Sequence, residues 1–456
     1  MTIKSIVFAY CPSFLKTFLE QIEAWPLGYR LARGAFWSLA GAIIARGLGM
    51  ISSILVARML GKTGFGELGI IQSTIGMFGT FAGFGLGMTA TKFIAEYRTT
   101  DPGKAGRILG LTTCFAWITS GITALVLFFT APWFAVHTLA APQLTGLLKV
   151  SSLLLLLTAV NGAQIGALSG LESFKTVAKI SFWCGLANFP LMVGGVYIAG
   201  LSGAVWGMVI ATGLNWMLNH NAIRGECLNT GVSYTYKDCW KEKTVLWKFS
   251  LPALISSIFI APTDWVMNAI LVNQPGGYGQ MGLFSVAMQW HVLIVYVPSA
   301  ISNMTMPILS NILGEGNRHY YNKMVMISTL TLTCIALLVA LPVALFSSSI
   351  MSLYGRDFIE GQNVLLFVCF YSVLWSANIV IGQVLWSTGA SGLAMVLAAT
   401  RAAILLGSFS FLTPHTAYGV VLAYCIAYVL QTIYQGILSA KHANMYFLRQ
   451  PIRTSK

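Results

Sequence analysis

Twelve stretches of about 20 predominantly apolar residues dominate the sequence, and they constrain the fold more than any other feature. A helix of about 20 residues is long enough to cross the hydrocarbon core of a bilayer, which is about 30 Å thick. The predicted spans cover residues 35–56, 68–90, 108–129, 147–168, 177–199, 203–221, 249–272, 282–304, 324–345, 364–386, 393–412 and 417–439. This pattern predicts an all-α, polytopic membrane protein.

The composition excludes the main soluble classes of protein. Of the 456 residues, 56% are hydrophobic and only 9% are charged, whereas about a quarter of the residues in a soluble domain are charged. A soluble enzyme, a nucleic-acid-binding module and a disordered chain are therefore excluded. None of the eight cysteines is spaced as CxxC, so we expect no disulfide framework and no metal site.

The basic residues predict how the chain is oriented in the membrane. Of the 27 Lys and Arg residues, 21 lie in or beside the termini and the loops after even-numbered spans, and three lie in loops after odd-numbered spans. Cytoplasmic loops carry the excess of Lys and Arg in membrane proteins. Both termini are therefore predicted to be cytoplasmic, and the net charge of +14 needs no nucleic-acid partner. Residues 14–25 could form a short helix at the membrane interface.

An internal repeat divides the chain into two halves of six spans each. The letters FGELGI around Gly66 match MGLFSV around Gly282, and QIGALSG matches QVLWSTG further along, with offsets between 212 and 219 residues. One register stays open, because GFGELGI can also be laid on GYGQMGL, which starts at Gly277. Parallel repeats of this kind are typical of transporters whose two bundles rock about a central site.

The repeat predicts five regions. They are an N-terminal segment 1–33, a first six-helix bundle 34–222, a cytoplasmic linker 223–248, a second six-helix bundle 249–440 and a basic cytoplasmic tail 441–456. The predicted connector between the fifth and sixth spans, around Gly200, is only a few residues long.

At this level of detail the sequence resembles the polysaccharide transporter family of O-antigen and lipid-linked oligosaccharide flippases. This family belongs to the MATE-like multidrug/oligosaccharidyl-lipid/polysaccharide exporter superfamily. In the first half the resemblance rests on FWSLAGAIIARGLGMISSILVARMLGKTGFGELGI and TATKFIAEYR. In the second half it rests on LPALISSIFIAPTDWVMNAIL, GLFSVA and MPILSNILGEGN.

The resemblance implies twelve helices in two bundles around a central V-shaped cavity. It also implies a flippase that moves undecaprenyl-diphosphate-linked oligosaccharide to the outer leaflet of the bacterial inner membrane. The implied partners are this lipid-linked substrate and the membrane lipids, with a polysaccharide polymerase and a chain-length regulator as further candidates. The motifs are mainly structural, so they identify the fold better than the cargo.

Charged residues inside the spans are the candidate functional residues, because a charge in mid-membrane costs about 2.5–3.5 kcal/mol. Arg46, halfway along the first span, could bind the diphosphate of the cargo, since a guanidinium offers forked donors to phosphate oxygens. It could instead pair with an acid or bond to backbone carbonyls. Arg401 in the eleventh span could be a second anion contact or could stabilise the packing of the second bundle.

Asp264 is the only acidic residue within a predicted span, and it follows Pro262. Because proline leaves backbone carbonyls unpaired and bends a helix, the two residues are candidates for a proton- or ion-responsive hinge. Asp264 could alternatively cap the freed backbone or pair with Arg46 across the cavity. Arg58 and Lys62, at the outer end of the first span, could snorkel to lipid headgroups or contact the departing cargo.

No sequence motif points to catalysis or to a cofactor. There is no nucleotide-binding loop, nucleophile elbow, pair of catalytic carboxylates or HExxH motif, so we expect neither an enzyme nor a bound cofactor. The favoured function is the flippase, since two intramembrane Arg against one Asp suit an anionic cargo. The alternative is a proton- or sodium-coupled drug or cation antiporter of the same superfamily. A membrane-bound enzyme is a third alternative.

Overall fold

The structure of the chain is a computed structural model, and it describes residues 26–388, 390–412 and 415–449. Every regular element in these ranges is a helix. The first half forms α3 (Pro26–Gly83), α4 (Leu86–Tyr97), α5 (Pro102–Trp133), η1 (Phe134–Thr138), η2 (Pro142–Leu144), α6 (Thr145–Gly170) and α7 (Phe174–Thr230). The predicted interfacial helix over residues 14–25 lies outside the described residues.

The second half continues the helical pattern with shorter pieces near its start. It forms η3 (Cys239–Glu242), η4 (Leu246–Ser250), α8 (Leu251–Ile258), α9 (Ala261–Val272), α10 (Gly277–Ile294), α11 (Tyr296–Glu315), α12 (Arg318–Leu345), α13 (Ser347–Tyr354), η5 (Arg356–Gly361), α14 (Gln362–Ser387), α15 (Ser391–Phe411) and α16 (Ala417–Arg449). Each of the twelve predicted spans coincides with one to three of these helices.

The helices of the described residues are suited to a multi-pass membrane protein. Seven are long and apolar enough to cross a bilayer, and nine segments qualify when each of two bent pairs, α3 with α4 and α10 with α11, counts as one span. The long helices α3 and α7 each contain a reversal, and α8 with α9 makes one further pass. The arrangement is therefore consistent with the twelve spans expected from the sequence.

The two reversals occur at glycines with positive φ. In α7, Ala199 and Gly200 leave helical geometry, and Gly200 has φ 55°. A Cβ added to Gly203 would lie 1.7 Å from the carbonyl oxygen of Gly195, so the arms 174–198 and 201–230 run side by side. In α3, Gly61 has φ 68° and separates the arms 26–60 and 62–83. The short connector around Gly200 is therefore a true reversal.

Three other spans are interrupted within their length. The break between α8 and α9 falls at residues 259–260, directly before Pro262 in the first turn of α9. The pairs α3–α4 and α10–α11 bend by 40° and 42°. The interruption beside Pro262 matches the bend predicted from the sequence, whereas its role as a hinge stays a prediction.

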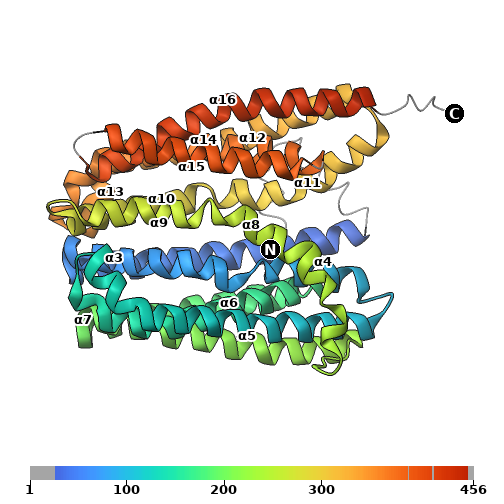
Figure 1. The fold of residues 1–456 in the computed structure, drawn as a ribbon, viewed down its shortest axis with the longest axis horizontal. Helices are drawn as coiled ribbons and strands as arrows, with labels where there is room; N and C mark the ends of the chain where they lie inside the picture. The colour runs from blue at the N-terminus through green and yellow to red at the C-terminus, as the bar shows by residue number, and fades with distance from the viewer. Residues whose placement is uncertain (1–25, 389, 413–414, 450–456) are drawn as a thin grey trace, which may run out of the picture.

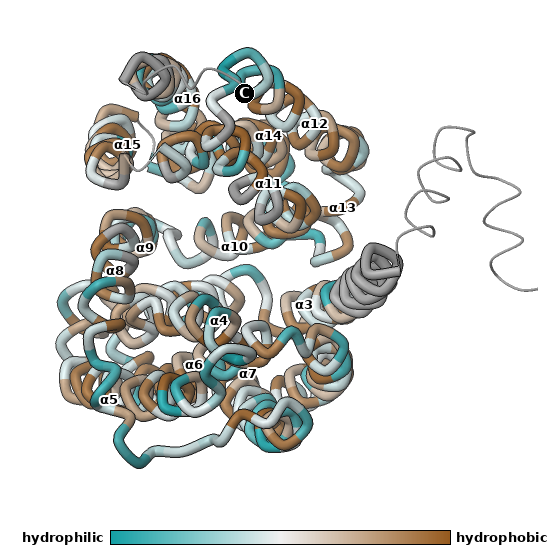
Figure 2. The backbone as a smooth tube through the Cα atoms, turned by 90° about the vertical axis from the view of Figure 1, so that its right-hand side faces the viewer, coloured by the Kyte–Doolittle hydropathy of each residue, from teal (hydrophilic) through white to brown (hydrophobic). Residues whose placement is uncertain are grey.

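The helices form two groups, which contact each other through α3 of the first group and α9 and α10 of the second. Helices α3 to α7 pack among themselves, α12, α14 and α16 pack with α10, α15 packs with α14 and α16, and α3 contacts α9 and α10. Figure 1 shows the two groups as stacked layers, with α13 at one end of the molecule and α4 at the other. Figure 2, which looks along the helices, shows the same two groups. We call the two ends of the molecule seen in Figure 1 the α13 end and the α4 end.

Repeat-related residues meet where α3 contacts α10. A Cβ added to Gly66 would lie 1.8 Å from the Tyr278 carbonyl oxygen, and one added to Gly282 would lie 2.1 Å from the Lys62 carbonyl oxygen. Lys62 and Tyr278 are 216 positions apart in the sequence, and so are Gly66 and Gly282. The two contacts are therefore the same contact seen from each repeat, as a two-fold relation requires.

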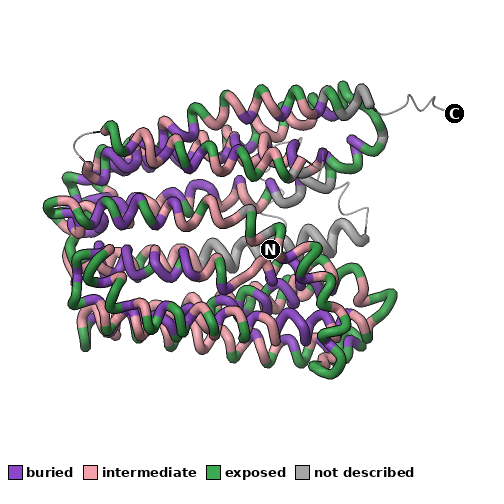
Figure 3. The backbone as a smooth tube through the Cα atoms, viewed as in Figure 1, coloured by how far each residue is buried: buried purple, intermediate pink, exposed green. Residues whose placement is uncertain are grey.

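A third contact between residues with the same spacing supports a two-fold axis that relates the two repeats. A Cβ added to Gly69 would lie 2.2 Å from Oγ of Ser285, which is again 216 positions later. The contacts favour the register that places Gly66 on Gly282 over the alternative that starts at Gly277. The closely packed residues, drawn purple in Figure 3, run along these facing helices toward the α13 end.

The segment between the two halves is packed against the first group of helices. α7 remains helical through Thr230, and the chain then passes so close to α5 that a Cβ on Gly106 would lie 1.9 Å from the Ser233 carbonyl oxygen. Arg107 and Glu242 form an ion pair with an N–O distance of 2.9 Å. These contacts hold the connection between the halves at the α4 end.

Candidate functional site

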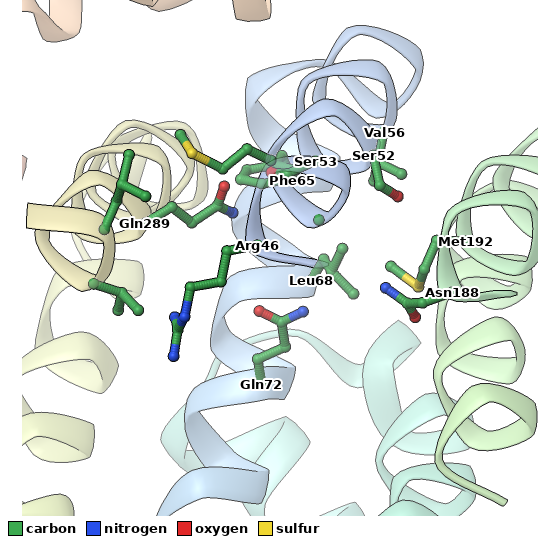
Figure 4. Close-up of a pocket in the computed structure, with 14 residues that line it drawn as sticks. Arg46, Ser52, Ser53, Val56, Phe65, Leu68, Gln72, Asn188, Met192 and Gln289 are labelled. Atoms are coloured by element: carbon green, nitrogen blue, oxygen red, sulfur yellow. The ribbon is translucent and has the colours of Figure 1, made fainter. Parts of the chain in front are cut away.

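A cavity of about 320 Å³ lies between the two groups of helices. Its walls come from both arms of α3, the 174–198 arm of α7, and α10. The residues that line it are Arg46, Gly49, Met50, Ser52, Ser53, Val56, Phe65, Leu68, Gln72, Asn188, Met192, Gln289, Val292 and Leu293. Figure 4 shows these side chains around the cavity.

Arg46 is the one charged side chain among the described residues that line this cavity. Its guanidinium carbon lies 4.1 Å from the ring centroid of Tyr296, the first residue of α11. Such a cation–π contact orients the guanidinium while leaving its N–H donors free. Within the described part of the chain, Arg46 forms no ion pair or hydrogen bond, so its positive charge remains available to a ligand.

The rest of the polar lining is neutral. Gln72 projects from α3, Asn188 from α7 and Gln289 from α10, and each lies within a predominantly apolar span. Oε1 of Gln289 and Oγ of Ser53 are buried and have no hydrogen-bond partner among the described residues. Buried polar atoms usually have a partner, so these two atoms are suited to meet a polar ligand or water. These residues were not predicted from the sequence, although a polar residue in mid-span was the signal that could have identified them.

The cavity occupies one side of the axis that relates the repeats, and the other side is closed. On the closed side, Nδ2 of Asn268 donates to Oγ of Ser73 at 2.8 Å, and Nε1 of Trp265 donates to Oγ1 of Thr74 at 3.0 Å. Ser73 is the repeat counterpart of Gln289, 216 positions earlier. The same position is therefore bonded on one side of the axis and unpartnered on the other.

The structure places Asp264 and Arg401 together inside the second group of helices. Asp264 accepts a hydrogen bond of 2.8 Å from the Tyr424 hydroxyl. The positive charge of Arg401 acts on Asp264, but no ion pair within 4 Å joins the two side chains. Nη1 of Arg401 donates to the Tyr428 hydroxyl at 2.8 Å, and the Arg401 side chain is buried. Neither charged residue lines the cavity.

Aromatic residues complete this cluster. The Tyr371 ring lies 5.3 Å from that of Tyr424 and 4.9 Å from that of Tyr428. His291 stacks on Tyr371 with ring centroids 4.6 Å apart, and its Nδ1 lies 2.9 Å from Oγ of Ser372. The cluster fills the centre of the second group of helices with side chains that contact one another.

The alternative in which Asp264 pairs with Arg46 finds no support in the described residues. Arg46 lies over Tyr296 on the cavity side, whereas Asp264 bonds to Tyr424 on α16. No ion pair within 4 Å joins the two. The sequence placed both residues at mid-span but could not give the rotation of their helices, which turns them toward different neighbours.

Arg58 lies at the α13 end and is not part of the cavity lining. Its Nε donates to the Leu353 carbonyl oxygen at 2.5 Å, and Nζ of the neighbouring Lys62 pairs with Glu360 at 2.6 Å. Both side chains thus join α3 to the second half of the chain. This arrangement was not among the expectations for these residues, which were lipid headgroups or cargo.

The described residues include no group of three His, Cys, Asp or Glu side chains that could hold a metal ion. Seven cysteines in this part of the chain are free. The arrangement of the cavity, with one cation and several neutral polar groups, is suited to binding an anionic, hydroxyl-rich ligand.

Comparison with known sequences finds one matching family. The sequence profile of the family described as Polysaccharide biosynthesis protein matches residues 31–313. The EPS I polysaccharide export inner membrane protein EpsE of Ralstonia nicotianae is 22% identical over 408 residues, which cover 87% of this chain and 91% of that protein. The lipid III flippase of Escherichia coli K12 is 23% identical over 288 residues, which cover 62% of this chain and 68% of that protein.

Comparison with solved structures identifies the fold. A multidrug resistance MATE family transporter of the MOP superfamily, in its inward-facing conformation, superposes with a TM-score of 0.73 and 15% identity, covering 91% of this chain and all of the other. A MOP superfamily transporter from Pyrococcus furiosus superposes with a TM-score of 0.67 and 15% identity, covering 91% of this chain and 96% of the other. The chain therefore has the fold of MATE-like transporters.

Proposed function

The chain belongs to the polysaccharide biosynthesis protein family, and we propose that it is a flippase for lipid-linked oligosaccharides. Its cargo would be an oligosaccharide carried on undecaprenyl diphosphate, moved from the inner to the outer leaflet of the bacterial inner membrane. The names of two relatives, a polysaccharide export protein and a lipid III flippase, support this class of cargo. The MATE-like fold supports a transporter without a catalytic step.

The observation that carries the proposal is Arg46, which has no ion pair among the described residues and lies in a cavity whose other polar groups are neutral. Moving the headgroup takes two phosphate charges and several hydroxyls through hydrocarbon, where unpaired polar groups cost several kcal/mol each. Arg46 would bind the diphosphate, and Gln72, Asn188 and Gln289 would replace part of the hydration of the sugar. The apolar tail of the carrier stays in the bilayer.

Alternating access would follow from the arrangement of the two groups of helices. The basic loops favour cytoplasmic termini, which makes the α13 end the outer end. In this conformation Lys62, Gly66 and Gly69 contact the second half at the outer end. Transport would then require the outer contacts to separate after the cargo binds. A polysaccharide polymerase and a chain-length regulator in the outer leaflet would be the next users of the cargo.

A deletion strain tests the function directly. Radiolabelled sugar is chased into lipid and surface fractions in the deletion strain and in the same strain carrying the wild-type gene. The flippase predicts that surface polysaccharide falls while undecaprenyl-diphosphate-linked units accumulate on the cytoplasmic leaflet. Normal surface polysaccharide together with a raised sensitivity to cationic drugs would instead favour the antiporter.

A further inference from the structure

A second cavity, of about 300 Å³, lies inside the first group of helices and adjoins the first. It is lined by Gln72, Ile75, Leu154, Thr158, Asn188, Met192, Met208 and Thr212. Gln72, Asn188 and Met192 line both cavities. Figure 4 shows Gln72 and Asn188 projecting from α3 and α7 toward a shared space, with Arg46 on the far side of Gln72. A ligand held at Arg46 therefore has the second cavity within reach.

The lining of the second cavity is polar but carries no charge. The hydroxyls of Thr158 and Thr212 donate to the carbonyls of Leu154 and Met208 in their own helices, at 2.8 and 2.7 Å. Their oxygen lone pairs remain free to accept hydrogen bonds. Because the donors are occupied by the backbone, these two hydroxyls are suited to receive O–H groups from a ligand.

The two shared amides supply the complementary donors. Nδ2 and Oδ1 of Asn188 have no hydrogen-bond partner within the described part of the chain, and Nε2 of Gln72 donates only to the Met208 sulfur at 3.6 Å. A side-chain amide offers an acceptor and two donors on adjacent atoms, which matches neighbouring hydroxyls on a ring. Ile75, Leu154 and Met192 add apolar surface for the C–H faces of such a ring.

We propose that this cavity is a subsite for a neutral sugar unit of the cargo, with Gln72 and Asn188 as specificity-determining residues. The proposal rests on the proposed function, because it assumes a headgroup whose diphosphate lies at Arg46. The subsite would select hydroxyl-rich rings over anionic ones, because it holds no cation to compensate a carboxylate. It divides recognition between a charge-binding site on α3 and a sugar-binding site within the first group of helices.

Binding to the purified, full-length protein in detergent tests the subsite. Two probes are compared: undecaprenyl diphosphate without sugar, and the lipid-linked oligosaccharides extracted from the bacterium that encodes the protein. We expect the wild type to bind the sugar-bearing probe at least tenfold more tightly. Gln72→Leu and Asn188→Leu should weaken the binding of the sugar-bearing probe about tenfold more than they weaken the binding of undecaprenyl diphosphate.

Arg46→Ala and Thr130→Val provide the two reference variants. Arg46→Ala should weaken the binding of both probes by a similar factor. Thr130 has the same hydroxyl-to-carbonyl bond as Thr158, to Val126, but lines neither cavity, so Thr158→Val should weaken the sugar-bearing probe by a few fold and Thr130→Val should not.

The outcomes separate the subsite from the function on which it rests. Equal wild-type affinity for both probes overturns the subsite and leaves the flippase intact. If Asn188→Leu weakens the binding of both probes equally, the subsite is also overturned, because Asn188 would then support the cavity without contacting the sugar. A wild type that binds neither probe contradicts the proposed function itself.

Discussion

The centres of the two groups of helices differ in how their polar side chains are partnered. In the first group, Asn188 and Thr158 face a cavity, and Arg46 at its border has no acidic partner in the part of the chain that the structure describes. In the second group, Asp264 and Arg401 are enclosed among tyrosines, of which Tyr424 bonds to Asp264 and Tyr428 bonds to Arg401. The repeats thus share a fold but differ at their centres: the first group of helices contains a cavity, and the second contains a packed cluster of side chains.

This difference separates charges that bind a ligand from charges that stabilise the fold. A buried charge with partners is destabilising to disrupt, because removing one member leaves the other uncompensated. A charge that faces a cavity without a partner contributes little to folding, so its removal affects binding. Substitution of Arg401 is therefore expected to reduce stability and substitution of Arg46 to reduce binding, although both residues are arginines in mid-span.

The largest expected effect is on the stability of the second group of helices. Arg401→Met removes the donor to the Tyr428 hydroxyl and the positive charge that acts on the buried Asp264, and leaving a buried charge uncompensated costs several kcal/mol. We expect less folded protein and a lower unfolding temperature, measured by size-exclusion chromatography after heating in detergent. The double variant Arg401→Met/Asp264→Asn should recover part of the loss, since it removes both charges. A single variant that is fully stable but inactive would place Arg401 among the binding residues.

The next effect concerns transport without a change in stability. Arg46→Ala removes the charge-assisted hydrogen bonds to a diphosphate, worth about 1.5–3 kcal/mol, so export should fall about 10- to 150-fold. Protein level and unfolding temperature should stay at wild-type values. Arg46→Lys should keep part of the activity if charge suffices and none if the forked geometry is required. Normal export by Arg46→Ala would remove this residue from the site.

At the axis the two repeats are alike, and here paired variants should behave alike. Gly66→Val and Gly282→Val each place a side chain against a backbone carbonyl of the other repeat, at a cost of about 1–3 kcal/mol. Spin labels at the exposed residues Thr63 and Ile359 report the distance across the α13 end. Both variants should lengthen this distance by similar amounts.

Gly76→Val is the matched control, because nothing lies within 4 Å of a Cβ at Gly76, and it should leave the distance unchanged. A shift in only one of the two axis variants would show that the contact is not shared equally between the repeats.

Much of the fold could be predicted from the sequence because membrane spans need long apolar runs. The register of the repeat could not be fixed, since GFGELGI matches two stretches equally well, until the contact of Gly66 with Gly282 decided it. The bend between α10 and α11 was missed, although Pro298 in the first turn of α11 lacks the N–H that would bond to the Ile294 carbonyl.

The candidate site could be predicted only in part, because mid-span position does not reveal which way a side chain faces. Arg46 stood out through its charge, and the structure places it on the cavity. Asp264 stood out equally but turns into the second group of helices. Gln72 and Asn188 carried no charge to mark them in a chain so rich in apolar residues, and their shared cavity depends on helix packing that one sequence does not specify.

The smallest expected effect distinguishes two contacts that hold the α13 end closed on opposite sides of the axis. Lys62 pairs with the exposed Glu360, whereas its repeat counterpart Tyr278 donates to the Leu139 carbonyl at 2.7 Å. An exposed ion pair contributes about 1 kcal/mol or less, and raising the salt from about 0.1 to 1 M shortens the Debye length from about 10 to 3 Å. In Tyr278→Phe, salt should therefore lengthen the distance between labels at Thr63 and Ile359. In Lys62→Met and Glu360→Gln the distance should not respond to salt, and a response there would show that another charged contact closes this end.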